Sequence, residues 1–279
     1  MIIDFRLRPP IKEYAETQMF ALDTIEVHAR LFGTIPPDGT PSARERSVQA
    51  LISEMDEAGV SVGVSCGRHR PGTEIPNSAL KRLADEYPGR FVPLASVDVL
   101  DAVRAKEMID EGVGDYDFPG IHIDLGVLGI APDDPRMAPI YDHCDRLDAI
   151  VAINTSAFGA QEQSLCNPES LDRAARDFPN VNFVSSHGSY PYVLQIVGVA
   201  AKRPNVYISP DVYMSNMPGG HMYVEAANSF LQDKVLFGSA YPYSSVSDIV
   251  SRYKKLPLSE EALEKIFWRN AHRLLNLGD

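Results

Sequence analysis

The sequence predicts a single α/β domain that folds as a (β/α)8 TIM barrel, with a helical segment inserted after the first strand. Short apolar runs recur along the 279 residues, and after the first they follow one another at intervals of roughly 30 residues. Each interval leaves room for one helix and two loops. No run is followed by the G-x-G-x-x-G that would favour the alternative, a doubly wound open sheet. No linker or charge run marks a boundary, so we expect one domain over residues 1–279.

Eight apolar runs are the expected strands. Each is short and apolar, which is typical of parallel strands covered by helices on the outside. The runs are IIDFRL (2–7), SVGVSC (61–66), FVPLASV (91–97), GIHIDL (120–125), AIVAIN (149–154), NFVSSH (182–187), VYISPD (206–211) and VLFGSA (235–240).

Three local signals mark helix starts between these strands. Ser42 and Glu45 form an S-x-x-E capping box ahead of an amphipathic run. Asn167 and Pro168 are a typical N-cap and first-turn pair. Ser259 precedes two glutamates, which suit the positive N-terminal end of a helix.

The interval between the first two strands is longer than the others and carries an insertion. Residues 11–32 have helical periodicity, and we expect the whole insertion, residues 11–41, to lie over the C-terminal mouth of the barrel. It is either a lid that shapes a pocket or an extra helix for packing or subunit contact.

Composition limits the classes of partner. The net charge of −12 argues against nucleic acid and anionic membranes, but not against a small anionic molecule. No run approaches the roughly 18 to 20 apolar residues of a membrane span, and the chain begins directly in a strand pattern without a signal peptide. Cys66, Cys144 and Cys166 lack metal or redox spacing, so we expect reduced thiols in a cytoplasmic protein.

The active-site residues of such a barrel lie at the C-terminal ends of its strands. The first strand is unusual there, because Asp4, Arg6 and Arg8 alternate with apolar residues and should share one face. The other strand ends supply further ionisable and polar residues. These are Arg68, Arg70, His122, Asp124, Asn154, His187, Asp211 and Tyr241.

Four segments carry a resemblance to a known family. They are IIDFRLRPP, FVSSHGSYPYV, VLFGSAYPY and the closing IFWRNAHRLL. In this order they resemble the amidohydrolase superfamily, in the branch that contains aminocarboxymuconate-semialdehyde decarboxylase and the amidohydrolase-related hydrolases. The resemblance implies a (β/α)8 barrel and a divalent metal. It also implies metal ligands from an H-x-H on strand one, histidines on strands five and six and an aspartate on strand eight.

This chain departs from that ligand pattern. Arg6 and Arg8 stand at the H-x-H positions, Asn154 at the strand-five histidine and Ala240 at the strand-eight aspartate, while His187 matches the strand-six histidine. Catalytic zinc normally takes three protein ligands, and guanidinium groups repel a dication in a pocket of low dielectric constant. We therefore expect no cofactor.

Zinc in a relocated site is the alternative to that expectation. Its ligands would come from His122, Asp124, His187 and Asp211, all ligand-type residues near strand ends.

The arginines suggest an anionic substrate. A guanidinium group matches a carboxylate with paired hydrogen bonds, so Arg6 and Arg8 would hold a carboxylate or an oxyanion. Arg68 and Arg70 could extend the positive mouth, and Asn154 and Asp124 could contact the substrate. The plainer alternatives are that Asp4 neutralises Arg6 and that the loop arginines are solvated.

His187 is the leading general acid–base candidate, because the pKa of histidine is tuned near neutrality. Asp211 could orient it or activate water, and Tyr241 could donate a hydrogen bond to an intermediate. The alternatives are a buried structural histidine, a loop-capping acid and an aromatic residue used for packing. His221 is a weaker candidate that could merely cap a helix.

These residues predict an amidohydrolase-like hydrolase that acts on a small carboxylated lactone or ester-like substrate without the usual metal. A decarboxylase or other lyase acting on a small carboxylic acid is one alternative, and a non-catalytic anion-binding barrel is another. Residues 11–32 and the stretch NMPGGHMYVEAANSF could bury surface between subunits of a homodimer.

Overall fold

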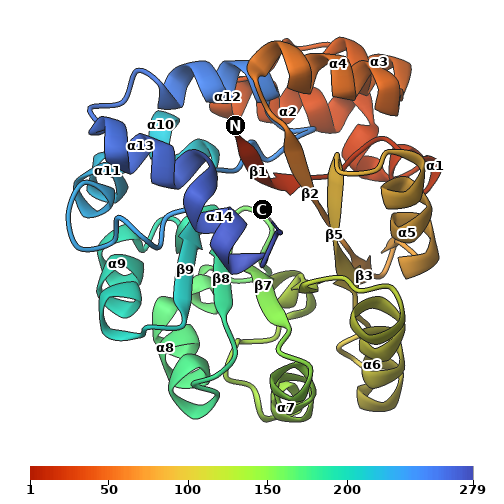
Figure 1. The fold of residues 1–279 in the computed structure, drawn as a ribbon, viewed down its shortest axis with the longest axis vertical. Helices are drawn as coiled ribbons and strands as arrows, with labels where there is room; N and C mark the ends of the chain where they lie inside the picture. The colour runs from red at the N-terminus through yellow and green to blue at the C-terminus, as the bar shows by residue number, and fades with distance from the viewer. Residues whose placement is uncertain (279) are drawn as a thin grey trace.

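The chain forms a parallel sheet of seven strands that curls into a barrel (Figure 1). A computed structural model describes residues 1–278. The strand order is β1-β2-β5-β6-β7-β8-β9, and every pairing in this sheet is parallel. The strands are β1 (Ile3–Leu7), β2 (Val62–Cys66), β5 (Phe91–Ser96), β6 (Gly120–Ile123), β7 (Ile150–Asn154), β8 (Phe183–Ser186) and β9 (Val206–Ser209). The predicted barrel and seven of its strands are confirmed.

The eighth expected strand, residues 235–240, closes the barrel without forming a regular ladder. Val235 makes a single parallel bridge with Ile208 of β9. On the other side, the backbone N–H of Phe5 in β1 donates to the carbonyl of Phe237 at 2.8 Å. The segment therefore joins β9 to β1. It then leaves extended geometry at Ala240, where φ is 63°, which explains why the run is not a full strand.

Helices cover the outside of the barrel (Figure 1). The helices that follow the strands are α4 (Val48–Ala58), α5 (Asn77–Glu86), α6 (Ala102–Ile109), α7 (Ala138–Arg146), α8 (Pro168–Asp177), α9 (Val193–Lys202), α10 (Val212–Asn216), α11 (His221–Ala227), α12 (Val246–Tyr253), α13 (Glu260–Glu264) and α14 (Asn270–Leu274). A short antiparallel hairpin, β3 (His69–Arg70) with β4 (Thr73–Glu74), follows β2.

Two apolar clusters hold these layers together. A large cluster fills the space between the sheet and the helices. A smaller one contains Ile3 and Phe5 of β1 together with Ala152 and Val184 from β7 and β8. Leu275, just after α14, packs against this inner cluster, so the C-terminal helix closes the end of the barrel opposite the mouth.

The first strand does not alternate as expected. Its pairing with β2 shifts register between Asp4 and Leu7, so Asp4 and the two arginines do not share one face. The Asp4 carboxylate accepts hydrogen bonds from the backbone amides of Arg6 at 3.0 Å and Ser239 at 2.9 Å. Asp4 therefore ties β1 to the closing segment instead of neutralising a guanidinium group.

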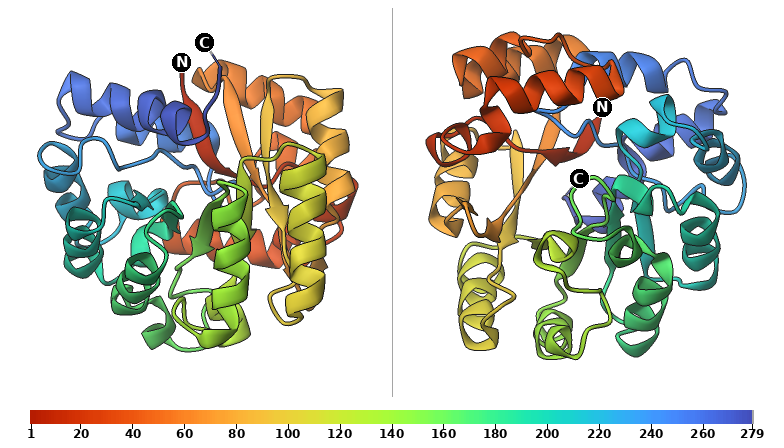
Figure 2. Two further views of the ribbon diagram at one scale, coloured as in Figure 1. Left: turned by 60° about the horizontal axis from the view of Figure 1, so that its bottom comes forward. Right: turned by 180° about the vertical axis from the view of Figure 1, so that it is seen from behind.

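The insertion forms α1 (Lys12–Ala15), a 3-10 turn (Gln18–Phe20), α2 (Leu22–Phe32) and α3 (Pro41–Glu45). Seen from the mouth of the barrel, it lies along one side of the opening (Figure 2, right, red to orange). Helix α2 places its apolar face inward, with Ile25, Ala29 and Phe32 buried.

The expected capping box at Ser42 is wrong. Thr40 caps α3, and Ser47 caps α4 by accepting a hydrogen bond from the backbone amide of Ala50 at 3.1 Å. Ser42 lies inside α3, where its backbone amide and hydroxyl both bond to Glu54. The capping-box spacing matched by chance within a stretch that holds two short helices.

None of the helices over residues 1–278 is long and apolar enough to cross a membrane. Cys66, Cys144 and Cys166 are free and buried.

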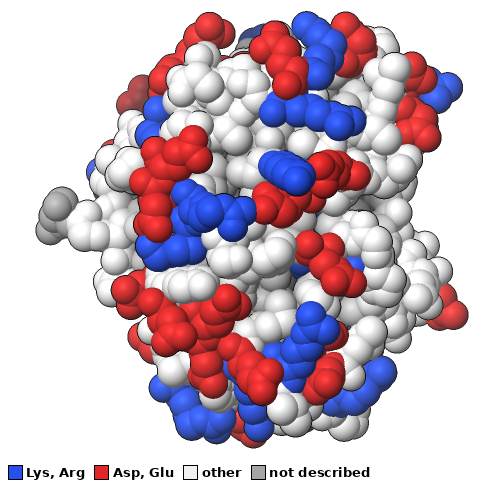
Figure 3. Space-filling view, turned by 90° about the vertical axis from the view of Figure 1, so that its right-hand side faces the viewer, with Lys and Arg blue, Asp and Glu red and all other residues white. Residues whose placement is uncertain are grey.

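On the face that Figure 3 shows, acidic and basic side chains are interspersed.

The cap assignment gives a stability prediction. Replacing Ser47 with Ala should lower the free energy of unfolding by ~1 kcal/mol, because an N-cap hydroxyl that satisfies a free helix amide is lost. Urea denaturation would measure the change. Ser53→Ala, in the exposed part of the same helix, is the control and should change the stability little. Equal losses in both variants would contradict the assignment.

Candidate functional site

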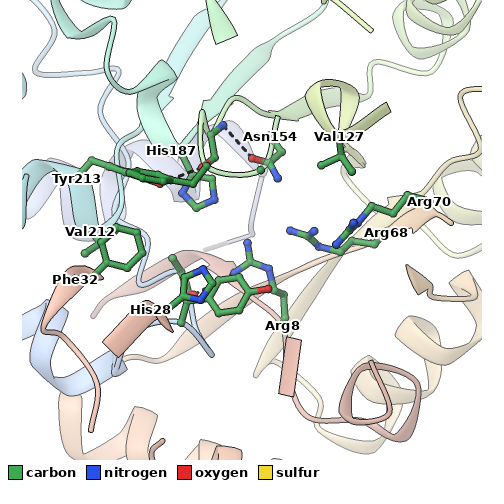
Figure 4. Close-up of a pocket in the computed structure, with 15 residues that line it drawn as sticks. Arg8, His28, Phe32, Arg68, Arg70, Val127, Asn154, His187, Val212 and Tyr213 are labelled. Carbon is green, nitrogen blue, oxygen red and sulfur yellow. Dashed lines mark hydrogen bonds between the residues drawn. The ribbon is translucent and has the colours of Figure 1, made fainter. Parts of the chain in front are cut away.

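A cavity of about 180 Å3 opens at the C-terminal ends of the strands (Figure 4). Its lining combines three arginines, aromatic rings and a few neutral polar groups. The lining residues are Arg8, His28, Phe32, Arg68, Arg70, Val127, Asn154, Ser156, Phe158, Gly159, His187, Val212, Tyr213, Ala240 and Tyr243. Of the expected site residues, Arg8, Arg68, Arg70, Asn154 and His187 are therefore at the cavity.

Arg8 is fully buried and is held from one side only. Its Nη1 donates hydrogen bonds to the carbonyls of Ala240 at 3.1 Å and Tyr241 at 3.0 Å. Its Nε and Nη2 are buried and have no hydrogen-bond partner among the described residues. Burial, followed by repulsion from Arg6 and Arg68, lowers the pKa of Arg8 to about 9. The free Nε–Nη2 edge is the geometry that binds a carboxylate with two parallel hydrogen bonds.

Arg6 lies beneath the cavity, between two histidines. Its Nη1 is 2.9 Å from Nε2 of His122, and its Nε donates to Nε2 of His187 at 3.0 Å. Guanidinium nitrogens only donate, so both Nε2 atoms accept. On the other side of the His122 ring, Nδ1 lies 2.7 Å from the carbonyl of Gly67, and therefore His122 carries its proton on Nδ1.

Asp211 completes this buried cluster. Its Oδ2 is 2.9 Å from Nδ1 of His187 and 3.3 Å from Nε of Arg6, both ion-pair distances without hydrogen-bond alignment. Its Oδ1 accepts a hydrogen bond from the Ser209 hydroxyl at 2.6 Å. His187 and Asp211 both have positive φ, 69° and 52°, a costly backbone conformation that is concentrated at functional sites.

The two buried imidazoles are neutral. Burial first, and then Arg6, lowers the pKa of His187 to about 3. Burial also holds the pKa of His122 well below its usual range. Both ring nitrogens of His187 face protein groups, Asp211 and Arg6, so neither is turned toward the cavity. The general acid–base role expected for His187 stays a prediction, and this geometry does not favour it.

A second charged cluster lies across the cavity from the first. Asp124 Oδ2 is 2.8 Å from Nη1 of Arg68 and 3.6 Å from Nε of Arg70. Asn154 Nδ2 donates to the other Asp124 oxygen at 2.6 Å. Burial, the largest single influence, raises the pKa of Asp124, but Arg68, His122, Asn154 and Arg70 together outweigh it, and the pKa falls below its usual range. Asp124 thus neutralises about one of the two arginines.

Two expected residues lie elsewhere. Tyr241 does not line the cavity, because its hydroxyl pairs with the Ser42 hydroxyl of α3 at 2.9 Å. His221 begins α11 and lines a separate surface groove with Met214 and Met217.

The structure adds residues that the sequence reasoning missed. His28 and Phe32 reach the cavity from α2, Tyr213 and Phe158 stack on each other along its wall, and Tyr243 stacks on His28. One signal was available for His28: it lies one helical turn before Phe32, on the side of the insertion that faces the barrel. Tyr243 differs from the expected Tyr241 by two positions.

Comparison with solved structures supports the fold. The chain superimposes on the uncharacterized TIM-barrel protein Bb4693 from Bordetella bronchiseptica with a TM-score of 0.93 and 35% identity, covering 99% of this chain and 98% of that one. A dihydroxybenzoic acid decarboxylase from Polaromonas sp. JS666, with bound manganese and the inhibitor 2-nitroresorcinol, gives a TM-score of 0.71 at 15% identity, covering 99% and 97%.

A curated relative matches over a shorter segment. It is the 2-amino-3-carboxymuconate-6-semialdehyde decarboxylase of Dictyostelium discoideum, which is 30% identical over 78 residues. That segment covers 28% of this chain and 22% of the relative.

The expectation that no cofactor is involved is contradicted, because the decarboxylase neighbour of this fold holds manganese. The residues at the corresponding end of this barrel do not fit a metal centre as they are arranged. The guanidinium group of Arg6 fills the space between His122 and His187, and Asp124 forms an ion pair with Arg68. Within residues 1–278, no three His, Cys, Asp or Glu side chains are grouped to hold a metal ion. The relocated zinc site is therefore not assembled either.

The neutral His187 gives a pH prediction. Its pKa is about 3 in the folded protein against 6.5 when unperturbed, so the unfolded chain binds more protons between these values. Folding stability is therefore complete above pH 6.5 and is lost as the pH falls toward 3. Between pH 5.5 and 4, His187→Gln should reduce the slope of unfolding free energy against pH by ~1.4 kcal/mol per unit.

Urea unfolding at several pH values would measure this slope. His221→Gln, at an exposed position, is the control and should retain the wild-type slope. A His187→Gln slope equal to that of wild type would show that His187 is protonated in the folded protein.

The family assignment rests on the sequence over nearly the whole length of the domain. A family model described as Amidohydrolase matches residues 25–277, which begin within α2 and include the barrel strands that follow it and the C-terminal helix. The resemblance inferred from the four motifs is confirmed. This chain belongs to the amidohydrolase family.

Proposed function

We propose that this protein is a lyase that removes CO2 from a small carboxylic acid bearing a second acidic or phenolic group. The observation that carries the proposal is the free Nε–Nη2 edge of Arg8. This guanidinium group is fully buried, and no carboxylate of the described residues forms an ion pair with it. A buried charge without a counter-ion is costly, so an anionic ligand is the natural partner.

The rest of the cavity supports a small planar acid. Arg68 and Arg70 carry two positive charges against the single negative charge of Asp124, which leaves a second, weaker positive position in the same cavity as Arg8. Phe158 and Tyr213 stack with ring centroids 6.1 Å apart and planes 10° apart, and they form an apolar wall on the side of the cavity opposite Arg68 and Arg70 (Figure 4). Such a wall favours an aromatic or conjugated skeleton.

Two positive positions suit decarboxylation. When CO2 leaves, the electron pair of the broken bond stays on the carbon skeleton, and negative charge develops there. An arginine that holds the retained acidic group lies close to that charge and stabilises it more than the departing carboxylate. The skeleton then takes up one proton at the carbon that lost CO2.

Two named relatives support a lyase over a hydrolase, since each is a decarboxylase. The hydrolytic reaction on a lactone or ester-like substrate stays a prediction, and no contact in the cavity specifically favours it. The expected homodimer likewise stays a prediction.

CO2 release tests the proposed function directly. Purified protein would be incubated with hydroxybenzoic acids and unsaturated dicarboxylic acids, with and without added MnCl2, and CO2 and product would be quantified. We expect at least one of these acids to be decarboxylated. Hydrolysis of a lactone without CO2 release would support the hydrolase instead. Tight acid binding without any turnover would support a non-catalytic barrel.

Arg8 should dominate substrate recognition. Arg8→Met should lower kcat/KM for the active acid by about 100-fold, ~3 kcal/mol, because two hydrogen bonds between charged groups are lost. Arg8→Lys keeps the charge but not the paired geometry, and an intermediate loss is expected. Arg136→Met, at an exposed ion pair with Asp134, is the control. Wild-type kcat/KM in Arg8→Met would contradict the assignment.

A further inference from the structure

His28 is an imidazole at the cavity with one nitrogen still available. It lies on α2, in the inserted segment, and its Nδ1 is 2.7 Å from the carbonyl of Thr24, one helical turn earlier. A carbonyl only accepts, so Nδ1 carries the proton. Its Nε2 has no hydrogen-bond partner among the described residues, and the ring lines the cavity.

The ring is held in place by stacking. His28 and Tyr243 lie face to face, with centroids 3.9 Å apart and planes 7° apart. The guanidinium carbon of Arg8 is 5.4 Å from the centroid of the same Tyr243 ring. Figure 4 shows His28, Arg8 and Arg68 converging on one small space. Arg8 and His28 both line this cavity of about 180 Å3, so a small acid that fills it and binds Arg8 lies close to His28.

The other two histidines of the site differ from His28 in this respect. His122 is held between Gly67 and Arg6, and His187 lies between Asp211 and Arg6. A proton donor needs a nitrogen that can reach the reacting atom. Of these three imidazoles, His28 alone offers one.

We propose that His28 is the catalytic acid–base residue of this site and that its Nε2 delivers the proton that replaces CO2 on the substrate carbon. The assignment rests on the proposed decarboxylation. The C–C bond to the carboxylate breaks and its electron pair stays on the carbon. The Nε2–H bond of the imidazolium breaks, the new C–H bond forms, CO2 leaves, and the neutral ring is protonated again from solvent.

The charges in the cavity determine when His28 becomes protonated. The charged and titratable groups that line the cavity with His28 are Arg8 just after β1, Arg68 and Arg70 beyond β2, His187 after β8, and the Tyr243 phenol. Burial, and then Arg8, lowers the pKa of His28 in the empty site. A bound acid places negative charge beside Arg8 and favours the imidazolium form. His28 therefore takes up its proton together with the substrate.

The first arm of the test measures this coupling without requiring turnover. Protein labelled with 13C and 15N in histidine would be titrated by NMR, free and saturated with phthalate or with benzoate. The His28 signal is identified by its loss in His28→Gln. We expect its pKa to lie below 6.5 in the free protein and to rise by about one unit with phthalate, as a nearby opposite charge requires. Arg8→Met should abolish the rise, and His221→Gln should not affect it.

The second arm measures the reaction of the most active acid. His28→Gln should lower kcat by about 100-fold or more, the range for loss of a general acid, and change KM by less than threefold. The pH profile of kcat should also lose the limb that reports His28. A melting temperature close to that of wild type shows that the variant is folded, as does a near-wild-type phthalate affinity at a pH above both the free and the phthalate-bound pKa of His28.

The outcomes separate the two proposals. A His28 titration that ignores phthalate, although phthalate binds, overturns the role of His28. So does wild-type kcat in His28→Gln. A His28 signal that responds to phthalate, without CO2 release from any acid, overturns the decarboxylase function. That result also overturns the proton transfer to carbon and leaves an anion-coupled imidazole.

Discussion

The buried guanidinium group of Arg6 is the interaction on which the mouth of the barrel depends. It connects β1 to His122 on β6, to His187 after β8 and to Asp211 after β9. A fully buried cation is tolerated only with such partners, so its position fixes four separate elements relative to one another. It also fixes the protonation of both imidazoles, because each must offer its Nε2 lone pair to a group that can only donate.

This arrangement determines where the charge of the site resides. Asp211 compensates Arg6, and Asp124 compensates much of the charge on Arg68 and Arg70. Arg8, which is anchored only by carbonyl oxygens, remains uncompensated. A chain with a net charge of −12 thus holds a locally positive cavity. Repulsion from the overall charge is screened over about a Debye length, whereas hydrogen bonds act at contact, so a negative net charge does not oppose a small anion at these arginines.

The regular part of the fold could be predicted from sequence, because apolar runs and their spacing report burial directly. The strand-end rule also located Arg8, Arg68, Asn154 and His187 at the mouth. It failed for Tyr241, since the closing segment leaves extended geometry at Ala240 and turns Tyr243 inward instead. The strand-end rule could not find His28, because the position of this residue at the cavity depends on how the insertion packs. Nor could composition show that Arg6 would take its place between two histidines.

The cavity is built from two parts of the chain with different constraints. The arginines come from the barrel, where Arg8 depends on the backbone of the closing segment, whereas His28 and Phe32 come from α2, outside the repeating strand–helix units. Changes in the insertion can alter one wall without disturbing the barrel core. Relatives that share the arginines but carry a different segment after the first strand would keep the positive side of the cavity and change the wall beside it. The insertion is thus where new chemistry can arise at little cost to the fold.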